Sequence, residues 1–151
     1  DDDFGMAFMK SQIAAGQKLP SDGKIFISVN DQDKRKIIDV AKRLANLGYE
    51  IVATSGTAEV LRKSGLAVEE VAKLDKGRPD IIDLIKNREV SLLINTPGGK
   101  ETKADEAKIR SLGIMQNLPL VTTLSGARAT ATGLEAAKKK GFPVKALQDY
   151  H

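Results

Sequence analysis

The sequence predicts an α/β fold in which helices cover both faces of a parallel sheet. Five short apolar runs have the length of single strands, and between them apolar residues recur at helical spacing. Glycine and proline stand at several junctions between the two kinds of segment. Strands and helices that alternate in this way form parallel sheets, because each helix returns the chain to the edge where the next strand begins. Ligands of such sheets bind at the carboxyl ends of the strands.

A single folded domain is expected from the length and composition of the chain. Its 151 residues, 41% of them hydrophobic, can bury one core. The chain has no cysteine, which is typical of a reducing compartment, and no apolar run approaches the ~20 residues that span a bilayer. We therefore expect a cytoplasmic protein with no membrane partner. Because the chain begins with Asp1 rather than Met, we also expect it to be a piece of a longer protein.

The first half of the sequence holds an N-terminal tail and two pairs of strand and helix. Residues 1–22 end in turn-forming residues around Pro20, so we expect them to be the tail of a preceding domain with a linker, and residues 23–151 to form the folded domain. Asn30 is a candidate helix cap, and Gly48 is a candidate C-cap. The predicted elements are a strand at residues 25–29, a helix over 37–47, a strand at 51–53 and a helix over 58–63.

Three further pairs complete the pattern. The run at residues 90–94 is the most apolar of all the predicted strands. Pro79 suits the first turn of the helix that precedes this strand. The predicted elements are strands at residues 67–71, 90–94 and 118–121, helices over 81–85 and 103–115, and a last helix from residue 125.

The turn Thr54-Ser55-Gly56-Thr57 joins a predicted strand to a predicted helix. Backbone N–H groups, hydroxyls and the positive end of a helix dipole meet at such a turn, where an anion such as phosphate can bind. An ordinary helix N-cap with a turn glycine has the same composition. Lys34 lies near the start of the preceding helix, where a cation opposes the helix dipole. Either an acidic neighbour, Asp31 or Asp33, or an anionic ligand would explain this lysine.

Further polar residues follow the other predicted strands, at the same edge of the sheet. The loop from Asn95 to Lys100 combines an amide, a hydroxyl and a cation, which suits hydrogen bonds to a sugar or base, although a turn shaped by Pro97 and its glycines would look the same. The residues placed at this edge are Ser28, Lys34, Thr54 to Thr57, Lys73, Asn95, Thr96, Thr122 and Thr123. Their convergence, rather than any one of them, predicts a polar ligand site.

Several catalytic classes lack the residues that they need. The single histidine is His151, which leaves no material for a Ser-His-Asp triad or a histidine-rich metal site. Neither the P-loop pattern nor G-x-G-x-x-G occurs. Asp105 and Glu106 are adjacent on a predicted helix, so their side chains diverge by ~100° and cannot easily share one substrate. With 4% aromatic residues, the sequence is also poor in platforms for base stacking.

Basic residues leave some alternatives open. The formal net charge of +4 suggests acidic ligands. Lys138-Lys139-Lys140 stands at a predicted helix end, where the dipole favours cations, but the run could also belong to a nucleic-acid patch. Arg78 could bind a phosphorylated partner, or pair with Asp75, Asp80 or Asp83.

Six short segments carry a resemblance to a known family. They are Ile27-Ser28-Val29, Asp33-Lys34, Ala53-Thr54-Ser55-Gly56-Thr57, Gly77-Arg78-Pro79, Ile94-Asn95-Thr96 and Thr122-Thr123-Leu124. In their order and spacing they resemble the C-terminal regulatory domain of the large subunit of bacterial carbamoyl phosphate synthetase, a member of the methylglyoxal synthase-like superfamily. The segment from Phe4 to Gln12 also resembles the end of the preceding ATP-grasp half. The resemblance implies a Rossmann-like three-layer sandwich with a central, mainly parallel five-stranded sheet.

The resemblance also implies a site and a role. The domain would bind a nucleotide monophosphate effector, UMP or IMP, and would contribute to an ornithine site. Because Pro97 and Ser55 differ from the residues of some family members, the choice between UMP and IMP stays open. By position, the phosphate would be held by Lys34, Thr54, Ser55, Gly56 and Thr57, the nucleoside by Ser28, Lys73, Asn95, Thr96, Lys100 and Asp105, and ornithine by Thr122.

The same resemblance implies how the domain belongs to a larger enzyme. The domain alone would be non-catalytic, with no cofactor or metal of its own. The parent ligase would use ATP with Mg and K, and would pair an ATP-grasp body with a glutaminase small subunit. It would supply carbamoyl phosphate to pyrimidine and arginine synthesis.

Two other functions remain as alternatives. Methylglyoxal synthase, a lyase acting on dihydroxyacetone phosphate, needs aspartates in a Gly-Gly-Asp type turn and an Asp-Pro-Leu type loop, together with a histidine. The corresponding segments here read Gly77-Arg78-Pro79 and Asn95-Thr96-Pro97, so the general base is missing. A basic module that binds RNA or DNA rests only on the net charge and the lysine run, and we expect no nucleic-acid partner.

Overall fold

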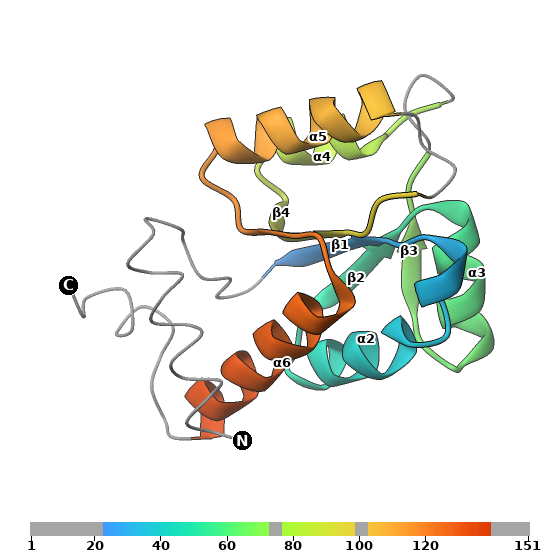
Figure 1. Ribbon diagram of the computed structural model, residues 1–151, viewed down its shortest axis with the longest axis vertical. Coiled ribbons are helices and arrows are strands. Elements are labelled where there is room, and N and C mark those ends of the chain that lie inside the picture. The colour runs from blue at the N-terminus through green and yellow to red at the C-terminus, as the bar shows by residue number, and fades with distance from the viewer. Residues whose placement is uncertain (1–22, 73–76, 99–102, 140–151) are drawn as a thin grey trace.

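The computed structural model describes residues 23–72, 77–98 and 103–139, which form one sheet of five parallel strands in the order β3-β2-β1-β4-β5 (Figure 1). The predicted α/β fold with a five-stranded parallel sheet is therefore confirmed. The strands are β1 (Lys24–Ser28), β2 (Glu50–Ala53), β3 (Val68–Glu70), β4 (Val90–Asn95) and β5 (Leu120–Val121). The expected N-terminal tail, residues 1–22, lies outside the described residues.

The helices form two layers around this sheet. Helices α2, α3 and α6 cover one face, and α4 and α5 cover the other (Figure 1). The chain moves outward from β1 to β2 and β3, then returns to the other side of β1 with β4 and β5. The helical elements are η1 (Asp31–Asp33), α2 (Ile37–Asn46), α3 (Ser55–Lys63), α4 (Ile81–Lys86), α5 (Lys103–Met115) and α6 (Leu124–Lys139).

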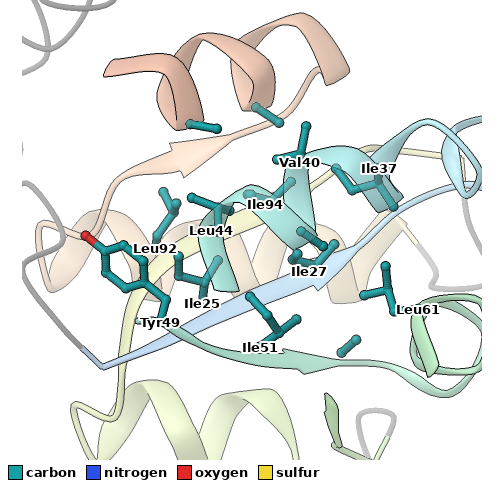
Figure 2. Packing of buried hydrophobic residues seen from close by; sticks show 14 of the residues in the cluster. Ile25, Ile27, Ile37, Val40, Leu44, Tyr49, Ile51, Leu61, Leu92 and Ile94 are labelled. Carbon is teal, nitrogen blue, oxygen red and sulfur yellow. The ribbon is translucent and has the colours of Figure 1, made fainter. Parts of the chain in front are cut away.

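Alternate side chains of β1 enter the two cores that hold these layers together. Ile25 and Ile27 pack under α2 and α6, whereas Phe26 packs under α4 and α5, and all three are fully buried. Helix α2 meets the first core with apolar residues spaced three and four apart, including Val40 and Leu44 (Figure 2). The central strand is thus fixed on both sides, and its carboxyl end is held in place.

The connection between β1 and α2 departs from the prediction. Asn30 does not cap α2; its Oδ1 accepts a hydrogen bond from the Asp33 backbone N–H at 3.0 Å and so caps the short 3₁₀ helix η1. Helix α2 begins only at Ile37, and Lys34 is the C-cap residue of η1. The reason is local, because an Asn side chain can accept a hydrogen bond from a backbone N–H two or three residues later in the chain, and this bond forms a turn without a full α-helix. This extra turn carries Lys34 past the end of β1.

The start of α4 also differs from the prediction. Pro79 does not begin the helix, because Asp80 is the N-cap and exchanges two hydrogen bonds with Asp83, each 3.0 Å long. Arg78 Nη1 donates to Asp83 Oδ1 at 2.7 Å, so one of the acidic partners that the sequence left open is the one observed. Arg78 therefore contacts the first turn of α4 through Asp83.

Candidate functional site

Buried polar side chains gather at the carboxyl ends of β1, β2 and β4. Within the described residues eight polar or charged side chains are buried, and five of them lie at this edge. The five are Ser28, Thr54, Thr57, Asn95 and Thr96. Buried polar groups require hydrogen-bond partners, so the bonds that these five side chains make indicate which kind of ligand could bind at this edge.

The end of β1 is joined to the start of α3 by two hydroxyl groups in contact. Ser28 Oγ and Thr54 Oγ1 lie 3.1 Å apart and share a hydrogen bond. Thr54 occupies the N-cap position of α3, yet its side chain makes no capping bond to that helix. The first backbone N–H groups of α3 are thus left uncapped by the residue that ordinarily caps them. This geometry goes against the interpretation of the turn as an ordinary side-chain cap.

Thr57, in the first turn of α3, provides another hydroxyl group at this edge, and a hydrogen bond fixes its orientation. Its Oγ1 accepts a hydrogen bond from the Val29 backbone N–H at 3.3 Å, and its side chain is almost completely buried. A threonine hydroxyl has one proton to donate besides the lone pairs that accept. Because the observed contact uses Thr57 as an acceptor, the hydroxyl proton can still be donated to a ligand.

Lys34 brings a cation to the start of α3. A Cβ atom added to Gly56 would lie 3.1 Å from Lys34 Nζ and 3.4 Å from its Cε, so the lysine packs closely against this glycine. The Lys34 side chain is only 16% exposed, and its ammonium pairs with the carboxylate of Asp31, which is 81% exposed. The positive charge therefore faces the positive end of a helix dipole, an arrangement that an anion between the two would stabilise.

The β4 side of the edge is connected to β1 through Asn30. The Asn30 backbone N–H donates to Thr96 Oγ1 at 2.9 Å, and its Nδ2 donates to the Pro97 carbonyl oxygen at 2.8 Å. The Thr96 backbone N–H in turn donates to the Ser28 carbonyl oxygen at 3.1 Å. In the sequence Asn30 is recognisable only as a candidate helix cap, and this connection is not. The contacts depend on β1 and β4 being neighbours, which no local pattern shows.

The remaining predicted site residues are placed differently. Ser55 is exposed in the first turn of α3, and Asp105 is half-buried in the first turn of α5. Thr122 is exposed just after β5, one strand beyond β4 at the same edge. Lys73 and Lys100 lie outside the described residues.

The described residues place hydrogen-bond donors and the Lys34 ammonium at this edge. Over residues 23–72, 77–98 and 103–139, no three His, Cys, Asp or Glu side chains are close enough to hold a metal ion. In the same part of the protein, none of the helices has the length and apolar character needed to cross a membrane. Lys138, from the lysine run, lies in the last turn of α6 and donates to the carbonyl oxygen of Leu47, the C-cap residue of α2, at 2.7 Å.

Comparison with known proteins agrees with the resemblance found in the sequence. Carbamoyl phosphate synthase large chains of Acidobacterium capsulatum and Methanobrevibacter smithii are 48% and 49% identical over 150 residues, which is 99% of this chain. In Methanopyrus kandleri, the C-terminal section of the corresponding large chain is 42% identical over 152 residues, covering all of this chain and 28% of that relative. This chain spans 14% of the length of the first two relatives.

Solved structures show the same fold at lower similarity. Methylglyoxal synthase from Elizabethkingia anophelis has a TM-score of 0.59 and 18% identity, covering 75% of this chain and 79% of that one. ForH has a TM-score of 0.57 and 18% identity, covering 82% of each chain. The MGS-like domain model matches residues 36–122, which include α3 and the β4 end of the site. The chain belongs to the MGS-like domain family.

Proposed function

We propose that this chain is the regulatory domain of a carbamoyl phosphate synthase large chain, and that it binds a nucleotide monophosphate at the carboxyl edge of its sheet. The observation that carries the proposal is the Lys34 ammonium packed against Gly56 at the start of α3. The chain's identity with these large chains over nearly its whole length supports the assignment to such an enzyme.

Phosphate is the group that best matches the donors at the start of α3. Backbone N–H groups of the first turn, the Thr57 hydroxyl proton and the Lys34 ammonium all donate, and together they suit an oxyanion with several acceptor oxygens. Ser55 and Thr54 complete the turn. The side chains buried at this edge are hydroxyls and an amide, so the arrangement supports binding of a phosphate rather than its elimination.

The nucleoside would extend from this phosphate along the ends of β1 and β4. Ser28 and Asn95 are paired in register there, and Thr96 is fixed by Asn30. Amide and hydroxyl groups of this kind recognise ribose and base edges. Lys73, Lys100 and Asp105 are proposed as further contacts, and Thr122 as part of an ornithine site beyond β5. UMP and IMP are both candidate effectors.

The proposed role is control of the parent ligase. Bound nucleotide would shift how the domain packs on the ATP-grasp body, and coupling between two such sites is typically ~1–3 kcal/mol, enough for a several-fold change in substrate affinity. The parent would use ATP with Mg and K, receive ammonia from a glutaminase subunit, and supply carbamoyl phosphate to pyrimidine and arginine synthesis. The domain itself would carry no catalytic step.

Calorimetric titration of the 151-residue protein tests the proposal. The ligands are UMP, IMP, dihydroxyacetone phosphate and uridine, which serves as the control that lacks a phosphate. We expect saturable binding of UMP or IMP, and at least about tenfold weaker binding of uridine because the charge-assisted phosphate bonds are lost. No binding of either monophosphate would contradict the proposal. Release of methylglyoxal from dihydroxyacetone phosphate would replace it with a lyase.

A further inference from the structure

Asp31 and Lys34 form an ion pair whose two members differ in their surroundings. The Lys34 side chain is 16% exposed and packs against Gly56, whereas the Asp31 side chain is 81% exposed. The lysine is therefore held by the fold on one side and by a solvated carboxylate on the other. Ion pairs with a strongly solvated member contribute little to stability, so this contact can be exchanged for another anion at small cost.

We propose that Asp31 sets the affinity of the site by competing with the phosphate for Lys34. The inference rests on the proposed function and names the residue that tunes it. In the structure the ammonium of Lys34, which faces the start of α3, pairs with the carboxylate of Asp31. A phosphate monoester carries about −1.5 to −2 charges near pH 7, so it draws the ammonium away from a carboxylate that carries only one.

Competition, rather than support, follows from how Lys34 is positioned. Its Nζ and Cε lie 3.1 Å and 3.4 Å from the position that a Cβ of Gly56 would occupy, so the lysine lies beside the first turn of α3 as well as beside Asp31. Asp31 adds a negative charge next to the place where the phosphate would bind, and like charges at short range repel. If Asp31 instead served to orient Lys34, removal of its charge would weaken binding. The two roles therefore predict opposite signs.

The test compares three variants of the 151-residue protein by calorimetry with UMP, IMP, inorganic phosphate and uridine. Asp31→Asn removes the competing charge at nearly constant shape, and Asp31→Glu keeps it. Glu89→Gln is the matched control, because it removes one negative charge from the Lys24 ion pair at the opposite edge of the sheet. Titrations are carried out at low and at high ionic strength.

We expect Asp31→Asn to bind UMP and inorganic phosphate about two- to fivefold more tightly at low salt, with a smaller gain at high salt. Asp31→Glu and Glu89→Gln should stay close to the unaltered protein, and uridine binding should not change. Unchanged or weaker binding by Asp31→Asn, or an equal gain in Glu89→Gln, would overturn the inference while leaving the proposed function intact. If the unaltered protein and Asp31→Asn bound neither UMP nor IMP, the proposed function would fail and the inference with it.

Discussion

Two lysines lie near the opposite ends of β1, and they differ in how fully nearby carboxylates offset their positive charge. Lys24 begins the strand, is 20% exposed, and has carboxylate oxygens of Glu69 and Glu89 each 3.1 Å from its Nζ. Lys34 follows the strand and is similarly shielded, but it has one solvated acidic partner and faces the start of α3. Only the first lysine is surrounded by charges that offset its own.

The difference separates a charge that is offset within the fold from the charge that we propose binds the effector phosphate. The carboxylates of Glu69 and Glu89 raise the pKa of Lys24 above its ordinary value, since both accept hydrogen bonds from the ammonium. Lys34 lies beside Gly56 in the first turn of α3, where the helix dipole is positive and offers no counter-charge to the ammonium. A site that leaves a shielded cation incompletely offset is suited to an anion from solution. Variants at the two ends of β1 can test this contrast.

Replacing Lys34 should have the largest effect. Lys34→Ala removes the charged donor from the proposed phosphate site, and we expect UMP binding to weaken at least about tenfold, since bonds to charged groups contribute about 1.5–3 kcal/mol. In the parent ligase the response to the effector should be lost while basal synthesis continues. Lys63→Ala is the control, because Lys63 is an exposed lysine near the other end of α3. An unchanged UMP response in Lys34→Ala would show that the phosphate binds elsewhere.

Thr57 should affect both stability and binding. Thr57→Val keeps the shape of the side chain but leaves the Val29 backbone N–H without its acceptor, which should lower the free energy of unfolding by about 1–2 kcal/mol. It also removes the hydroxyl proton proposed for the phosphate. Thr57→Ser retains the hydroxyl and should bind UMP nearly normally. Denaturant unfolding and calorimetry measure the two effects, and equal UMP affinity in both variants would remove Thr57 from the site.

Replacing Gly56 should weaken binding less than replacing Lys34 and should not lower stability. An added Cβ would lie 3.1 Å from Lys34 Nζ, so Gly56→Ala should displace the ammonium by a few tenths of an ångström. We expect about two- to fivefold weaker UMP binding, as for partial loss of one charge-assisted bond. Stability should stay the same or rise by up to about 1 kcal/mol, because alanine favours the helix over glycine. Normal affinity in this variant would mean that the close approach has no role.

The fold could be predicted from the sequence because its signals are local. The spacing of apolar residues predicted a helix over residues 37–47, and the structure places α2 at Ile37–Asn46. Gly48 follows α2 with a φ of 103°, as a C-cap glycine should. The turn at Thr54 was located for the same reason, since it lies where one apolar pattern gives way to another. Periodicity was enough for these features.

The arrangement of the site could be predicted only in part, because its contacts join distant segments. The sequence placed Ser28, Thr54 and Asn95 at one edge, yet it did not show that Thr54 bonds to Ser28 instead of capping α3. Nor did it show that Lys34 packs against Gly56, or that Asn30 joins β1 to Thr96. The contact between Thr54 and Ser28 depends on strand order, and the contacts of Lys34 and Asn30 involve residues that flank the extra turn η1. Such features follow from tertiary packing and leave no mark in local spacing.

Lys24 should show the smallest effect, and only on stability. Lys24→Met removes the ion pairs with Glu69 and Glu89, and we expect the free energy of unfolding to fall by no more than about 1 kcal/mol, since both carboxylates are partly solvated. Because the folded pKa of Lys24 lies above its ordinary value of 10.5, this contribution is present below pH 10.5 and is lost as the pH rises through the folded pKa. The difference between the unaltered protein and Lys24→Met should therefore be constant near neutral pH and shrink in strongly alkaline solution. Unfolding curves over this range measure it, and UMP affinity at neutral pH should match that of the unaltered protein. Weaker UMP binding in Lys24→Met would contradict the contrast between the two lysines, because Lys24 would then also contribute to UMP binding.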